Sequence, residues 1–270
     1  TNHFDDLCEV ITSIRNERAK ANKAPSKPID ITISCKDEDA LSKLQAAESY
    51  LVKFTNPKNL VLTLDQISSE GNVLVVLSKA NIYIPNSVEL ISQTAFRGCE
   101  NLNMVTFGNS THIIGDRAFE NCTSLKIVNI PNSVTRIGDY AFKNCTSLTK
   151  ITMPNGISHI GAGAFEKCIS LSKIELPNTI TNLSNDLFKN CENLNAITLP
   201  ITLSSIGENA FFNCSSLRKI VIPSSVEKIE AGAFIGCRSL TICCRSEFKP
   251  GNWSAYWNYD NCHVIWGYQE

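Results

Sequence analysis

The sequence has no excess of either charge, with 25 lysine and arginine residues against 26 aspartate and glutamate residues. This balance excludes a whole-chain attraction to nucleic acid or to an anionic membrane, so any such attraction needs a local cluster. No run approaches the roughly 18 consecutive apolar residues of a membrane-spanning helix. Paired cysteines at the close spacing of structural zinc sites are also missing. The sequence therefore predicts neither a membrane partner nor a metal site.

Cysteine, by contrast, is abundant and regularly placed. Seven of the 12 cysteines follow one another every 23 residues, each with a phenylalanine three residues before it and a leucine three residues after it. They are Cys99, Cys122, Cys145, Cys168, Cys191, Cys214 and Cys237. A fixed period of this length is typical of a solenoid, in which each repeat forms one coil that packs on its neighbours.

The same period indicates the oxidation state of these cysteines. Adjacent coils lie about 4.8 Å apart, so the seven side chains are expected to form one buried column rather than separate disulfides. Free thiols in such a column act as small hydrophobic groups and favour a reducing compartment. We therefore expect a cytoplasmic location, with which the polar start of the chain agrees. Cys243, Cys244 and Cys262 lie outside the period, so two of them could form a disulfide.

Each repeat predicts a short strand followed by a turn. Alternating inward side chains mark the strand, as in Ile174 and Leu176, and Pro177 ends it because proline lacks the N–H that a further ladder bond needs. An Ile-Gly corner and an Ala-Phe pair then fill the core from the other side. The expected fold class is a solenoid of short parallel strands with 23-residue repeats.

This pattern, over Ile82 to Leu240, resembles the BspA-type leucine-rich repeats. The resemblance implies a solenoid that binds other molecules, often at a cell surface, and that carries no catalysis. Conservative departures from the repeat occur at Thr111, Leu183-Ser184 and Leu187.

A solenoid must cover the apolar face at each end. We expect the solenoid over residues 82–242 and a tryptophan-rich cap over residues 243–270, in which Trp253, Trp257 and Trp266 cover the last coil. The alternative is that the three tryptophans form a stacking platform for bases.

The first 81 residues lack the repeat and predict a small α/β module. Helices are expected over Phe4–Ala21 and Asp37–Phe54 because their apolar residues recur at helical spacing. Strands are expected over Ile29–Cys35, Asn59–Gln66 and Asn72–Leu77.

Within this module, Glu9–Ile33 resembles the segment of valyl-tRNA synthetases that follows the anticodon-binding helical bundle. The matching residues are Ile14, Arg15, Arg18, Pro25, Ser26 and Lys27. Gly71–Pro85 resembles the end of the same module, after which that family continues into a coiled coil. The resemblance implies a parent valine-tRNA ligase that uses ATP and Mg in its catalytic core. This chain carries no catalytic residue of that core and implies no cofactor of its own.

Two sets of residues are candidate binding sites. The resemblance implies tRNA phosphate contact for basic residues of the first module, namely Arg15, Arg18, Lys20, Lys23 and Lys27. The outward strand positions of the solenoid form the second set, namely Lys150, Lys173, Lys219, Asn129, Thr152 and Thr198. Ordinary solvated side chains are the alternative for both sets.

The sequence therefore predicts a non-catalytic C-terminal region of a valine-tRNA ligase, in which a leucine-rich solenoid replaces the coiled coil. It would assist the binding of tRNA or of a protein partner. The alternative is a BspA-type adhesion or protein-interaction protein at the cell surface.

Overall fold

The computed structural model describes residues 84, 86, 88–100 and 102–269, and the backbone of four strands nearer the N-terminus. These strands are β1 (Ile29–Ser34), β2 (Pro57–Thr63), β3 (Val73–Leu74) and β4 (Ala80–Ile84). The first three form a parallel sheet in the order β2-β1-β3, at or near the predicted strand positions. The helices predicted over 4–21 and 37–54 lie outside the described residues, so the α/β module stays a prediction.

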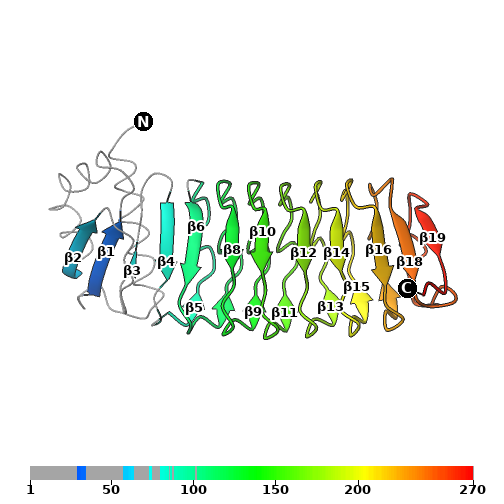
Figure 1. Ribbon diagram of the computed structural model, residues 1–270, viewed down its shortest axis with the longest axis horizontal. Coiled ribbons are helices and arrows are strands. Elements are labelled where there is room, and N and C mark those ends of the chain that lie inside the picture. Colours follow the sequence, from blue (N-terminus) through cyan, green and yellow to red (C-terminus); the bar gives the residue numbers. More distant parts are fainter. Residues whose placement is uncertain are drawn as a thin grey trace.

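From β4 onward the chain winds into a row of coils (Figure 1). The coils from β4 to β17 have one strand on either side, and the last two, at β18 and β19, have a strand in the first row alone. The first strand row follows β4 with β6 (Leu102–Phe107), β8 (Ile127–Asn129), β10 (Lys150–Thr152), β12 (Lys173–Glu175), β14 (Ala196–Thr198), β16 (Lys219–Ile222), β18 (Thr241–Cys244) and β19 (His263–Ile265). The second strand row contains β5 (Leu90–Ile91), β7 (Ile113–Ile114), β9 (Arg136–Ile137), β11 (His159–Ile160), β13 (Asn182–Leu183), β15 (Ser205–Ile206) and β17 (Lys228–Ile229). The predicted parallel solenoid is confirmed.

The strand register reproduces the sequence period. Ile151 pairs with Val128, and Ile160 pairs with Ile137, in each case its counterpart one repeat earlier. The last coils are shorter by one residue, because Lys219 pairs with Thr241 and Thr241 pairs with His263. Cys243 and Cys244 lie outside the cysteine period because they are the strand partners of Val221 and Ile222 and not members of the cysteine column.

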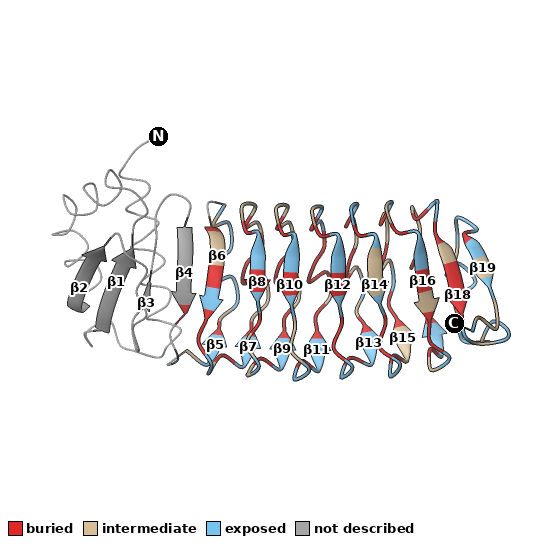
Figure 2. Cartoon of the chain, viewed as in Figure 1, coloured by how far each residue is buried: buried red, intermediate tan, exposed pale blue. Residues whose placement is uncertain are grey.

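The interior consists of columns of identical side chains. The phenylalanines of successive coils are fully buried, and their rings stack with centroids 5.2–5.8 Å apart. These are Phe119, Phe142, Phe165, Phe188, Phe211 and Phe234. Buried residues line the inside of the coils and exposed residues the outside (Figure 2). One continuous apolar core therefore runs along the solenoid axis.

From Cys122 to Cys237 the cysteine column is buried as predicted, whereas Cys99 in the first coil is half-buried. Each of these six buried thiols donates to the carbonyl oxygen of the phenylalanine 26 residues earlier, as Cys145 does to Phe119 at 3.2 Å and Cys191 to Phe165 at 3.1 Å. Cys262 directly precedes β19 and donates to the carbonyl of Cys237 at 3.3 Å. Cys243, Cys244 and Cys262 are free thiols, so the disulfide considered for them does not form.

The glycine corners have a steric reason. A Cβ atom at Gly138 would lie 2.6 Å from the backbone nitrogen of Asp116 on the preceding coil. At two of the departures from the repeat pattern, a side-chain hydroxyl group donates a hydrogen bond to a carbonyl of the preceding coil. Buried Thr111 donates to the carbonyl of Val88 at 2.9 Å, and Ser184 donates to that of Ile160 at 2.5 Å.

Replacing one ring of the phenylalanine column should destabilise the whole solenoid. Phe165→Ala removes a fully buried ring that stacks on both neighbours, and it should lower the free energy of unfolding by about 3–5 kcal/mol. Urea denaturation measures the loss. Ile169→Ala, at a 38% exposed position of the same coil, is the matched control and should change it by less than about 1 kcal/mol. Equal effects of the two substitutions would contradict the stacked core.

The buried thiols should make the protein sensitive to alkali. Burial raises the pKa of Cys191 to about 12, that of Cys244 to about 12 and that of Cys262 to about 11. Below the ordinary thiol pKa, both states keep these protons and the stabilisation is complete. Above it, only the unfolded chain loses them, so stability should fall by up to about 1.4 kcal/mol per cysteine per pH unit.

Urea midpoints measured from pH 8 to pH 10 test this dependence. Cys191→Ala should reduce the slope of stability against pH by about one proton. A midpoint that stays constant over this range would show that the thiols ionise equally in both states.

Candidate binding face of the solenoid

The outward side of the first strand row carries two columns of side chains. The first column contains Met104, Ile127, Lys150, Lys173, Ala196 and Lys219. The second contains Thr106, Asn129, Thr152, Glu175, Thr198 and Val221. All are exposed or half-buried, as predicted from the alternation, and we call this surface the strand face. The role of these residues in binding stays a prediction.

Two of the three candidate lysines interact within the chain. The Nζ atom of Lys173 lies 2.8 Å from Oε1 of Glu175, and this hydrogen bond lowers the pKa of the Glu175 carboxyl group. Lys219 donates to the hydroxyl of Tyr268 at 2.7 Å, and its Nζ atom lies 4.6 Å from the centre of that ring. Within the part that the structure describes, no carboxylate pairs with exposed Lys150. The three lysines are therefore not an equivalent row of free charges.

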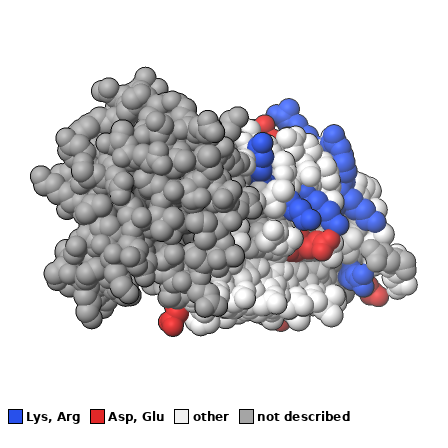
Figure 3. Space-filling model, turned by 60° about the vertical axis from the view of Figure 1, so that its left-hand side comes forward, with Lys and Arg blue, Asp and Glu red and all other residues white. Residues whose placement is uncertain are grey.

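The polar members of the second column also contact one another. The hydroxyl of Thr152 donates to Oδ1 of Asn129 at 3.0 Å, one coil away. Thr198 lies exposed further along the same column. Figure 3 shows lysine and arginine atoms toward the upper part of the described surface in view, with an acidic patch beside them and a largely uncharged region below. The strand face thus combines cations, hydroxyl and amide groups, and one carboxylate.

Two ion pairs on the irregular side of the coils join neighbouring coils. Arg97 lies 2.7 Å from the nearly buried Glu120, and Lys143 lies 2.8 Å from the nearly buried Glu166, in each case across one coil boundary. Lys143 also lies 5.0 Å from the centre of the Tyr140 ring. These contacts have a structural purpose, so the irregular side is a weaker candidate for binding than the strand face.

The tryptophans pack against the last phenylalanine of the column and against one another. Trp253 and Trp257 are only 3% and 6% exposed, and Trp257 meets the ring of Phe234 edge-on at 6.1 Å. The indole N–H of Trp253 donates to the carbonyl of Val226 at 3.2 Å. Base stacking needs open ring faces, so that alternative is wrong for these two residues. Half-buried Trp266 packs beside them, 5.7 Å from the Trp253 ring.

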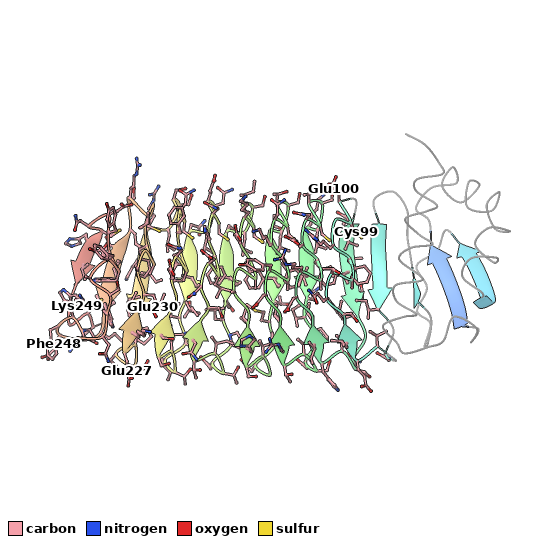
Figure 4. The ribbon with its side chains drawn as sticks, turned by 180° about the vertical axis from the view of Figure 1, so that it is seen from behind. Cys99, Glu100, Glu227, Glu230, Phe248 and Lys249 are labelled. Atoms are coloured by element: carbon pink, nitrogen blue, oxygen red, sulfur yellow. The ribbon has the colours of Figure 1, made fainter. Side chains whose placement is uncertain are left out.

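The capped end and the opposite end of the solenoid are easily distinguished. Figure 4 shows Phe248 and Lys249 at the C-terminal end and Cys99 and Glu100 near the other. Phe248 is 74% exposed, so it is not part of the cap packing.

Other kinds of site receive no support from the described part of the chain. No cluster of histidine, cysteine or acidic side chains there could hold a metal ion, and no helix there could cross a membrane. The candidate tRNA-binding residues Arg15, Arg18, Lys20, Lys23 and Lys27 lie outside the described residues.

Comparison with known families agrees with this geometry. The model of the BspA type leucine rich repeat region matches residues 76–195 and 181–264, in six copies. The chain belongs to the BspA-type leucine-rich-repeat family. A leucine-rich-repeat protein of T. pallidum superposes with a TM-score of 0.56 at 29% identity, covering 61% of this chain and 79% of that one. For one from Bacteroides ovatus the TM-score is 0.53 at 25% identity, with coverage of 70% and 55%.

A second group of relatives consists of valine–tRNA ligases, which match less than a third of this chain. The chain is 38% identical over 79 residues to a valine–tRNA ligase of Halalkalibacterium halodurans, which is 29% of this chain. It is 35% identical over 81 residues, or 30% of this chain, to that of Streptococcus pneumoniae. The BspA-type chain spans 9% of the length of these curated relatives. The predicted fusion to such an enzyme therefore stays a prediction.

Proposed function

We propose that the solenoid is a non-catalytic protein-binding module and that its partner lies on the strand face. The observation that carries this proposal is the contrast between the two sides of each coil. Two ion pairs on the irregular side, Arg97–Glu120 and Lys143–Glu166, cross coil boundaries, whereas the strand face presents exposed or half-buried columns over six successive coils. At about 4.8 Å per coil, the face is roughly 24 Å long, which suits an extended segment of another protein.

We also propose that this module is joined to the C-terminal region of a valine-tRNA ligase. The match of 79 residues to valine–tRNA ligases supports this, because its length agrees with the predicted module over residues 1–81. In that setting ATP and Mg would act in a catalytic core outside this chain, and Arg15, Arg18, Lys20, Lys23 and Lys27 would contact tRNA. The nine buried cysteines of the described part are not joined in disulfides, which favours a cytoplasmic location over the cell surface.

Selection of peptides tests the strand face. Peptides selected from a displayed random 12-residue library against the full chain should bind at least about tenfold more weakly to Thr152→Trp, because the indole would cover the centre of the face. His159→Trp is the matched control at an exposed position of the second strand row, and it should leave binding unchanged. Selected peptides that bind Thr152→Trp as tightly as the unchanged chain would contradict the proposed face.

Salt-dependent binding tests the tRNA contact. A valine tRNA transcript should bind the full chain with an affinity that falls steeply as salt rises, by a slope of about 0.7–0.9 for each phosphate contact. Joint substitution of Arg15 and Arg18 by alanine should reduce both the affinity and the slope. The triple substitution Lys150→Ala, Lys173→Ala and Lys219→Ala should change neither. The opposite pattern would move the RNA contact to the solenoid.

A further inference from the structure

We infer that the strand face binds a short acidic segment of the partner protein, with an apolar residue at one end of that segment. This inference rests on the proposed function and adds the chemistry of the partner. Its basis is a basic cluster on the second to fourth coils of the strand face, beside an apolar pair on the first two coils, of which one residue is exposed and the other half-buried.

The basic cluster consists of Lys126, Lys150 and Lys173, which lie on three successive coils. Lys126 directly precedes β8, and its carbonyl accepts the backbone N–H of Thr149, the neighbour of Lys150. All three lysines are exposed. Within the described part of the chain, neither Lys126 nor Lys150 has a carboxylate partner, and Glu175 is the counterion of Lys173 alone. The cluster therefore carries an excess of positive charge although the whole chain is nearly neutral.

The apolar pair consists of Met104 and Ile127, which are strand partners in β6 and β8. Ile127 is 45% exposed and is in turn the strand partner of Lys150. An aliphatic side chain of the partner could bury area on this pair while an adjacent carboxylate meets the lysines. From Met104 to Lys173 is three coil steps, or about 14 Å, which an extended segment of about five residues spans.

The same features favour a protein segment over nucleic acid. A phosphate backbone gains nothing from Met104 and Ile127, and the carboxylate of Glu175 would repel it within the cluster. A peptide can avoid Glu175 because its charges alternate with neutral groups. An extended peptide also places successive side chains on opposite sides, so acidic residues at every second position would all point at the strand face.

Fluorescence anisotropy with a synthetic peptide tests the inference on the full chain. The probe is a labelled decapeptide with one leucine followed by four acidic residues at alternate positions, and its analogue with asparagine and glutamine is the neutral control. The acidic peptide should bind at least about tenfold more tightly than the neutral one. Lys150→Glu should remove this difference, whereas Arg136→Glu, the matched change at an exposed position of the second strand row, should leave it intact.

Two further variants separate this inference from general damage to the fold. Glu175→Gln should tighten binding of the acidic peptide several-fold, because it releases Lys173 and removes a repulsive charge. Ile127→Asp should weaken binding, whereas Ile113→Asp, at a comparably exposed position of β7, should not.

The possible failures are distinguishable. Weaker or unchanged binding by Glu175→Gln, or no effect of Lys150→Glu, would overturn the acidic partner. If peptides from the random library still bind more weakly to Thr152→Trp, the strand face would remain the binding site. Only the acidic character assigned to the partner would then be wrong. Tighter binding of a single-stranded RNA of equal charge, unaffected by Ile127→Asp, would overturn the inference in favour of nucleic acid.

Discussion

The constant distance between successive coils is the constraint on which the rest of this structure depends. Parallel strand pairing sets that distance, and every interior side chain must then pack on its own counterpart one repeat away. Phenylalanine satisfies this requirement by stacking, with rings nearly parallel in most of the column. Cysteine satisfies it differently, since it is small enough for the column and its thiol also donates to a carbonyl of the preceding coil.

The same constraint determines where function can reside. Side chains inside the coils pack on neighbouring coils, and the ion pairs Arg97–Glu120 and Lys143–Glu166 join coils on the irregular side, so these groups are not available to another molecule. The strand face differs because its side chains point outward from paired strands. The sequence varies on this face from Ile127 to Lys150 to Ala196, while the phenylalanine inside each coil does not change.

Much of this arrangement was predictable because residues at equivalent positions of successive repeats contact one another. The positions of Phe142, Cys145 and Leu148 within one period were enough to place all three in the core. Contacts between residues without a periodic relation were not predictable. The hydrogen bond between Lys219 and Tyr268 joins the first strand row to the last described residues. The one-residue shortening of the last coils moved the strand at Cys243 and Cys244 away from the position that the 23-residue period predicts. Motif resemblance suggested the candidate residues of the first module without any repeat to fix their contacts.

The near-equivalence of the coil interfaces has an evolutionary consequence. Since Phe142, Phe165 and Phe188 each meet a neighbour of the same kind, a whole coil could be duplicated or lost by recombination within the gene without creating a new type of core contact. Such an event would lengthen or shorten the outward surface by one unit and bring a new set of side chains into it. The protein could therefore change what it recognises by gaining or losing whole repeats faster than it could by altering its interior.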